Sequence, residues 1–186
     1  MRQEDAPSIT FQTRLPLAWE NPGTPDEATL GAWRQENLTL LRALATLESM
    51  VPDKERELDQ ALGKAVERME AKIDVMLTLM ARLVGQQNSL PPSLPLTLAA
   101  QHVEWACPAA VAPPADSHVL LKVYPSPKLP EPLRLWVRVA TQPARSQGED
   151  CYCLAEFLDE DAEFEEWMTR TLFRYHRRAL QARHQQ

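Results

Sequence analysis

Apolar residues in the middle of the chain recur at alternating gaps of three and four, the spacing of one helix face. The stretch "AVERMEAKIDVMLTLMARLVG", residues 65–85, keeps this spacing until Gly85, and we expect a helix from Asp53 to Val84. At 1.5 Å per residue this helix would be about 48 Å long. The a and d positions of its heptads hold, in chain order, Leu62, Val66, Met69, Ile73, Met76, Met80 and Leu83.

A shorter apolar series before it predicts another helix. The sequence "TPDE", residues 24–27, offers Thr24 as N-cap, Pro25 at the first helical position and Glu27 three residues after the cap, which is a capping box. Pro52 ends the series, and a one-residue slip between the two heptad registers predicts two separate helices. The a and d positions of the first are Leu30, Trp33, Asn37, Leu40, Leu44, Leu47 and Val51.

The flanking segments are predicted to be β structure. We expect a strand from Ile9 to Trp19, and then three segments separated by proline-rich connections: "LTLAAQHVEWA", "SHVLLKVY" and "LRLWVRVA". The third places Leu133, Leu135, Val137 and Val139 on one face and Arg134, Trp136 and Arg138 on the other. A strand "CYCLAEF" follows, and a helix from about Asp161 to Ala182 closes the chain. Its apolar face, predicted to pack on the sheet, is Phe164, Met168, Thr171, Leu172 and Tyr175.

The helix from Asp53 to Val84 is too long to be covered by its own β domain, because a domain of roughly 100 residues has a radius of gyration near 13 Å. Near the C-terminal end of the second helix, Leu77, Leu79 and Val84 widen the apolar stripe beyond the a and d seam. A broad stripe favours three or more helices around the seam. We therefore expect a homo-oligomer, a tetramer before a dimer. The alternatives are a monomeric helical hairpin and a methionine-rich groove for a partner helix.

Composition and charge narrow the function classes. The chain has 186 residues, 44% of them hydrophobic, and a net charge of −6, which argues against a dedicated nucleic-acid binder. The N-terminus lacks an apolar signal region, and no apolar run approaches the ~18 residues of a membrane span, so we expect a cytoplasmic protein without membrane insertion. The odd number of cysteines, Cys107, Cys151 and Cys153, fits reduced packing residues.

Motifs for catalysis and metal binding are missing from the sequence. No glycine-rich phosphate loop occurs, the four histidines are scattered, and no nucleophile has a recognisable base. Cys-x-Cys at 151 and 153 has neither zinc-knuckle nor redox spacing. We therefore expect no enzyme and no metal site.

The order of the parts resembles a PilZ domain. An N-terminal arm precedes "LTLAAQHVEW", "LRLWVRVA" and "CYCLAEFLDED", which leads into "FEEWMTRTLFRYHRRALQAR". The resemblance covers about residues 8–20 and 94–182 and implies an α+β fold: a small six-stranded antiparallel β-barrel with a C-terminal helix, formed by residues 1–23 and 91–186. The two long helices of residues 24–90 would be an inserted, oligomeric coiled coil, as in the atypical, tetrameric PilZ proteins of xanthomonads.

The resemblance also directs attention to a nucleotide site. The family binds cyclic di-GMP through Arg-x-x-x-Arg before the barrel and Asp/Asn-x-Ser-x-x-Gly in an early strand. Aligned on the second motif, this chain has Thr97, Ala99 and His102 at the three informative positions, and all three depart from it. Upstream, Arg2 and Arg14 each lack an arginine four residues away. The resemblance thus implies weak or no nucleotide binding and no other cofactor.

Together these observations predict a non-catalytic PilZ-type adaptor in cyclic di-GMP signalling, which self-assembles and contacts a protein partner in cyclic di-GMP or motility machinery. Two alternatives stay open. One is a receptor that binds cyclic di-GMP through a noncanonical basic surface with Arg134, Arg138 and the last helix. The other is a purely structural coiled-coil oligomer.

Overall fold

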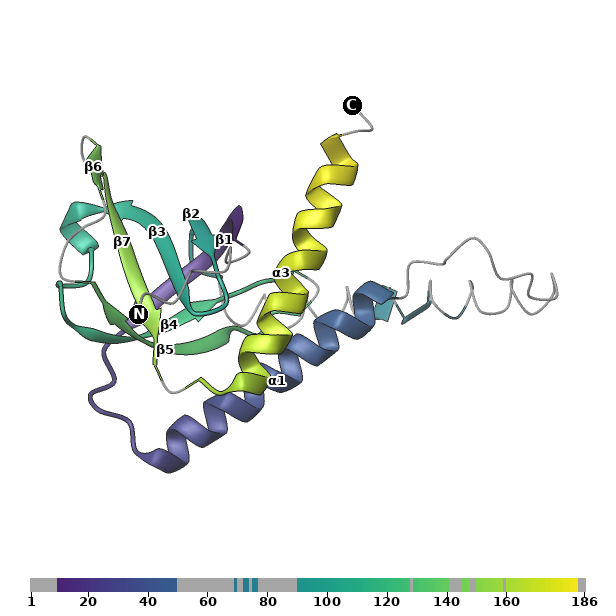
Figure 1. Cartoon of the computed structure of the whole chain (residues 1–186), viewed down its shortest axis with the longest axis horizontal. Coiled ribbons are helices and arrows are strands. Elements are labelled where there is room, and N and C mark those ends of the chain that lie inside the picture. Colours follow the sequence, from purple (N-terminus) through teal and green to yellow (C-terminus); the bar gives the residue numbers. More distant parts are fainter. Residues whose placement is uncertain are drawn as a thin grey trace, which may run out of the picture.

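The computed structural model of the chain describes residues 10–49, 69, 72–73, 75–76, 90–127, 129–140, 145–147, 150–158 and 160–183. Within them the strands form a barrel (Figure 1). All pairings are antiparallel, in the order β3-β2-β1-β4-β5-β7, and β3 also pairs with β7, which closes the ring. The strands are β1 (Phe11–Glu20), β2 (Ser93–Leu98), β3 (His102–Pro108), β4 (His118–Val123), β5 (Leu133–Val139), β6 (Arg145–Gln147) and β7 (Asp150–Phe157). The predicted six-stranded antiparallel barrel with a C-terminal helix is confirmed.

The barrel core follows the alternation read from the sequence. On β5, Leu133, Leu135, Val137 and Val139 are buried, whereas Arg134, Trp136 and Arg138 face outward. The sequence segment "LTLAAQHVEWA" is not one strand but the hairpin of β2 and β3, because Ala99 turns the chain and donates its N–H to the carbonyl of His102 at 2.9 Å. The short β6, which was not predicted, pairs with the first residues of β7.

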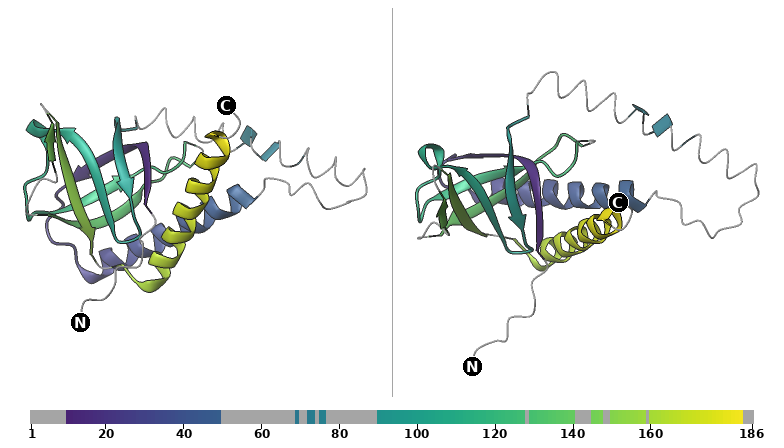
Figure 2. Two further views of the ribbon diagram at one scale, coloured as in Figure 1. Left: turned by 45° about the horizontal axis from the view of Figure 1, so that its top comes forward. Right: turned by 90° about the horizontal axis from the view of Figure 1, so that it is seen from above.

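Two long helices lie side by side next to the barrel (Figures 1 and 2). Helix α1 (Glu27–Ser49) runs along β5, and helix α3 (Ala162–Arg183) packs on α1. A single 3₁₀ turn, η1 (Ala109–Val111), follows β3. Both long helices were predicted, but the apolar face of α3 packs mainly on α1 and touches the barrel chiefly at β1, instead of covering the sheet. Phe164, at its start, meets Phe157 of β7 edge-to-face at 6.2 Å.

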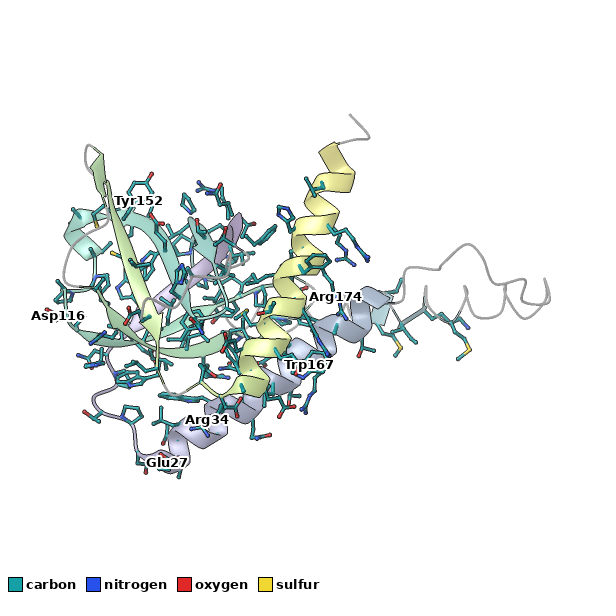
Figure 3. All side chains as sticks on the ribbon, in the orientation of Figure 1. Glu27, Arg34, Asp116, Tyr152, Trp167 and Arg174 are labelled. Atoms are coloured by element: carbon teal, nitrogen blue, oxygen red, sulfur yellow. The ribbon has the colours of Figure 1, made fainter. Side chains whose placement is uncertain are left out.

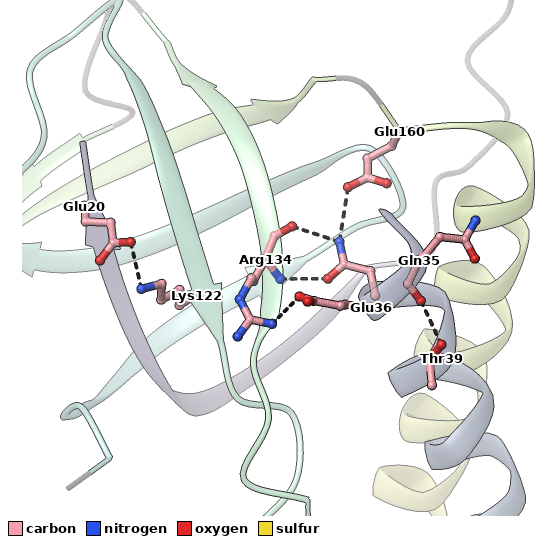
Figure 4. Close-up of polar contacts among 8 residues, drawn as sticks. Glu20, Gln35, Glu36, Thr39, Lys122, Arg134 and Glu160 are labelled. Carbon is pink, nitrogen blue, oxygen red and sulfur yellow. Dashed lines mark hydrogen bonds and ion pairs between the residues drawn. The ribbon is translucent and has the colours of Figure 1, made fainter. Parts of the chain in front are cut away.

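Asn37 fixes α1 to the barrel. Its side-chain amide donates to the carbonyl of Arg134 at 2.8 Å and accepts from the N–H of Arg134 at 2.7 Å. These contacts lie on the edge of β5 that faces away from β4. Strand β7 pairs with this edge only at Val137–Val139, so it does not extend to Arg134. The carboxylate of Glu36 pairs with the guanidinium of Arg134 at 2.6 Å beside them (Figure 4). One amide thus takes the place of a missing strand and satisfies two buried backbone groups.

These contacts correct the predicted role of the first heptad series. Asn37, Leu40 and Leu44 are buried inside the chain, on the side of α1 that faces β5 and α3. They are therefore not available as a seam for a second copy. Leu30 and Trp33 are half-buried, while the side chain of Leu47 and all of Val51 lie outside the described residues. The division of the chain at residue 24 stays a prediction, although α1 and the barrel share one core.

Between the two helices, an aromatic ring is held between two cations. Trp167 of α3, labelled in Figure 3, has the guanidinium of Arg170 5.3 Å and that of Arg42 5.9 Å from its ring centre. Arg42 of α1 also pairs with the carboxylate of Glu163. The contacts of Arg42 with Trp167 and Glu163 join α1 to α3, whose side chains Met168 and Leu172 are buried.

The N-cap of α1 is Asp26 and not Thr24. The Asp26 carboxylate accepts the N–H of Thr29 at 2.9 Å, and its carbonyl accepts the N–H of Leu30 at 3.0 Å. The predicted capping box is therefore wrong by two residues. Gly23, with φ of 82°, turns the chain into this cap, and its N–H donates to the Asn21 side chain. Hydrogen bonds from the hydroxyl and N–H of Thr29 lower the pKa of Asp26 below its ordinary value of 3.8.

Replacing Asp26 with alanine is expected to lower the melting temperature of the chain at neutral pH, because an N–H of the first turn loses its acceptor. A lowered pKa in the folded state means that the cap stabilises above the unfolded pKa of 3.8 and loses its effect as the pH falls through the folded value. Thermal unfolding followed by circular dichroism should therefore show a difference that shrinks in acid. Asp26→Asn, which keeps the acceptor but not the charge, should show less pH dependence; a pH-independent difference for Asp26→Ala would contradict this role.

Candidate functional site

An open groove of about 380 Å³ lies where the β2–β3 turn meets the start of α3. Gln101 of the turn donates to the carboxylate of Glu165 on α3 at 2.8 Å, which fixes one wall to the other. The lining residues are Ala100, Gln101, His102, Glu156, Phe157, Glu160, Asp161 and Glu165. The groove is built from the stretch that was aligned with the nucleotide motif of the family.

The structure places the three departing motif positions around this turn. Thr97 lies on β2 opposite Glu104 of β3, and Ala99 is fully buried beneath the turn. His102 begins β3, lines the groove and lies opposite Glu156 of β7. Ala99 stands at this turn, and its N–H donates to the carbonyl of His102. Because Ala99 also carries a β-carbon, a ligand cannot approach the backbone here as closely as it could at a glycine.

The groove is acidic. Of its eight lining residues, four are carboxylates and none is Lys or Arg, within the part of the chain that the structure describes. Asp161 uses one oxygen to cap α3, accepting the N–H of Phe164 at 2.8 Å. Glu156 accepts from the guanidinium of Arg138 at 2.7 Å, which brings one cation to this rim. The arrangement suits a cationic or neutral group better than a phosphate.

The two arginines of the alternative basic surface are both engaged. Arg134 pairs with Glu36 at 2.6 Å, and Arg138 pairs with Glu156 at 2.7 Å. Trp136 lies between them on the outer face of β5 and stacks on His118 with ring centres 5.9 Å apart. Upstream, Arg14 donates to the carbonyl of Ser93 at 3.1 Å, while Arg2 lies outside the described residues. Arg14, Arg134 and Arg138 therefore do not form an open phosphate clamp.

A second candidate surface is the predicted seam of the inserted helix. Met69, Ile73 and Met76 are helical and exposed, and they share one face at spacings of four and three. Leu62, Val66, Met80 and Leu83 lie outside the described residues. Most large apolar side chains that the structure leaves exposed are on helices and not on the barrel: Met69, Ile73, Val75, Met76, Phe173 and Leu180, against Leu90 and Val111.

The sequence and the fold of this chain are similar to those of known proteins. The sequence profile described as "Atypical PilZ domain, cyclic di-GMP receptor" matches residues 41–184. The chain belongs to the atypical PilZ family. PilZ domains are cyclic di-GMP receptors or adaptors, and the match covers most of the middle region as well as strands β2–β7. No sequence among the curated proteins matches the chain.

A solved structure supports the same assignment. It is that of a pathogenic protein from Xanthomonas campestris, described as a new tetrameric PilZ domain self-assembled via a helical bundle. This PilZ domain is 27% identical to it, with a TM-score of 0.74, and the alignment covers 94% of this chain and 92% of that one. Among the described residues, no helix has the length and apolar character needed to cross a membrane.

Sequence reasoning missed two features of the site. The acidic groove arises because β7 and the start of α3 bring Glu156, Glu160 and Glu165 beside the β2–β3 turn, and no local motif announces this. Asn37 was noticed as a polar residue in an apolar stripe, but it was assigned to a coiled-coil seam. The signal for its role is that it is the lone polar residue in a buried stripe. Its partner, the carbonyl of Arg134 on the barrel, is known only from the structure.

Proposed function

We propose that this PilZ domain is a non-catalytic, cytoplasmic signalling adaptor that self-assembles through its inserted helices and binds cyclic di-GMP weakly or not at all. The observation that carries the nucleotide part is the acidic groove at Ala100–His102. The support for assembly is the exposed stripe of Met69, Ile73 and Met76 and the likeness to the tetrameric relative. It then transmits its signal by contacting a protein partner in cyclic di-GMP or motility machinery.

Electrostatics oppose a dianionic ligand in this groove. At an effective dielectric constant between 20 and 80, two like unit charges about 6 Å apart repel by roughly 1–3 kcal/mol. Glu165 already accepts from Gln101 and Asp161 caps a helix, so both carboxylates are held at the groove. Each such carboxylate near a ligand phosphate would lower affinity about fivefold to a hundredfold, and no arginine among the described residues that line the groove offsets it.

Calorimetric titration of the full chain with cyclic di-GMP tests this. We expect heats at the level of dilution, because the groove repels phosphates and Arg134 and Arg138 are paired. A PilZ receptor that carries Arg-x-x-x-Arg, titrated with the same nucleotide stock, is the positive control. Arg134→Ala with Arg138→Ala serves as the matched variant on this chain.

Micromolar binding by the unmodified chain would contradict the proposal. If the double arginine variant abolished that binding, the receptor with a noncanonical basic surface would be correct. If binding survived the double variant, the groove itself would be the nucleotide site despite its charge.

A further inference from the structure

Three cysteine thiols converge inside one end of the barrel. Cys107 comes from β3, and Cys151 and Cys153 come from β7. The antiparallel register sets Cys107 opposite Cys151 and Trp105 opposite Cys153, so that these side chains share the interior face. Tyr152, labelled in Figure 3 near β6, marks this end of β7. These are all the cysteines of the chain.

The three sulfur atoms form a nearly equilateral triangle. Cys107 Sγ is 3.9 Å from Cys151 Sγ and 3.8 Å from Cys153 Sγ, and the latter two are 4.0 Å apart. The point equidistant from them lies about 2.3 Å from each sulfur, which is the length of a zinc–thiolate bond. An ion in the plane of the triangle would therefore contact all three without any shift of the paired strands.

The donor set indicates which class of ion fits. Among the described residues, no His, Asp or Glu joins the three thiols as a further ligand. Structural zinc sites need four protein ligands, and the described residues supply three. An all-sulfur set selects soft ions, among which Cu(I) is the main biological example.

A buried hydrogen-bond donor lies beside the three thiols. The indole N–H of Trp105 is buried without a partner of normal hydrogen-bond geometry, and it lies close to the Cys107 thiol. A metal-bound thiolate is a better acceptor than a thiol, so loading the site would give this donor its partner.

We propose that Cys107, Cys151 and Cys153 form a buried binding site for one soft, thiophilic metal ion of the Cu(I) class. The site joins β3 to β7, the pair that closes the barrel, so that a bound ion stabilises the folded chain. This role is independent of nucleotide binding and of assembly. Each thiol that becomes a metal thiolate releases one proton to solvent, and no electron is transferred.

Protons compete with the ion for this site. Burial raises the pKa of Cys107 to about 11 and raises that of Cys153 as well, so these two thiols are neutral at neutral pH. Among the described residues, no carboxylate or imidazole belongs to the cluster to compete for these protons. Affinity for the ion therefore falls as the pH is lowered.

Anaerobic titration of the reduced full chain with Cu(I), in competition with a chromophoric Cu(I) chelator, tests the proposal. We expect one ion per chain, a higher melting temperature, and X-ray absorption with three sulfur neighbours at about 2.3 Å. Cys107→Ser, Cys151→Ser and Cys153→Ser should each lose binding. Circular dichroism checks that every variant folds, and Cys→Ala versions, which bury no hydroxyl, replace any serine variant that does not.

A variant that keeps three thiols but moves one of them away tests whether the arrangement of the thiols, and not their number, binds the ion. Cys153→Ser combined with Thr39→Cys, an exposed position on α1, restores three thiols without the triangle. It should stay as weak as Cys153→Ser alone. The proposal is overturned if the unmodified chain does not compete with the chelator, if this variant binds as tightly as the unmodified chain, or if nitrogen or oxygen ligands appear in the absorption spectrum.

Discussion

Ile73→Asp combined with Met76→Asp is expected to reduce the mass of the assembly about fourfold, to that of one chain. Both side chains are helical and exposed, and they occupy consecutive a and d positions of the predicted second heptad series. In the proposed assembly, the two new carboxylates of each chain would lie close to the same carboxylates of the other chains. The cost of desolvating them and the repulsion between like charges both oppose this contact. Light scattering coupled to size exclusion measures the change.

The same helix supplies the control. Val75 is also apolar and is 58% exposed, as is Met76, but it occupies a c position outside the seam. Val75→Asp should therefore leave the mass unchanged. Circular dichroism of the double variant should still report a folded barrel, because neither residue contributes to the described core. Loss of assembly in Val75→Asp, or an intact tetramer in the double variant, would place the interface elsewhere.

Asn37→Leu is expected to reduce the free energy of unfolding by about 2–5 kcal/mol, although leucine has a similar size and suits a helix. The substitution leaves both the N–H and the carbonyl of Arg134 without their partner, and each such buried group costs about 1–3 kcal/mol. Since whole domains are stable by only about 5–15 kcal/mol, this is a large share. Urea unfolding measures it.

Thr39→Ala is the matched control on the same helix. The Thr39 hydroxyl bonds only to the carbonyl of Gln35 one turn earlier, and the side chain is exposed. We expect a change within about 0.5 kcal/mol, as is usual at the surface. If Asn37→Leu were equally neutral, the two hydrogen bonds to β5 would not be what holds α1 in place.

Much of the barrel could be predicted from periodicity alone. The alternation on β5 and the helix after Asp161 were right because each buries one face against a single neighbour. The β2–β3 turn was missed since it contains Ala99, Ala100 and Gln101, with no Gly, Pro or Asn to mark it. The cap of α1 was misplaced because Thr24 and Asp26 both offer oxygen acceptors two residues apart, and only backbone geometry decides between them.

The candidate sites depended more on tertiary structure. Heptad spacing cannot distinguish a seam between copies from a face buried in the same chain, and for Asn37, Leu40 and Leu44 the barrel and α3 provide the cover. Cys107 is far in sequence from Cys151 and Cys153, and the register of β3 with β7 unites them. The departures at Thr97, Ala99 and His102 were visible in the sequence, but the carboxylates around them were not.

The central claim is that this PilZ domain acts as a self-assembled adaptor, and the mass of the intact chain in solution tests it most directly. One chain has a mass of 21.1 kDa. Multi-angle light scattering over a range of micromolar concentrations should give four times that value, unchanged by addition of cyclic di-GMP. A mass of one chain at every concentration would contradict the account.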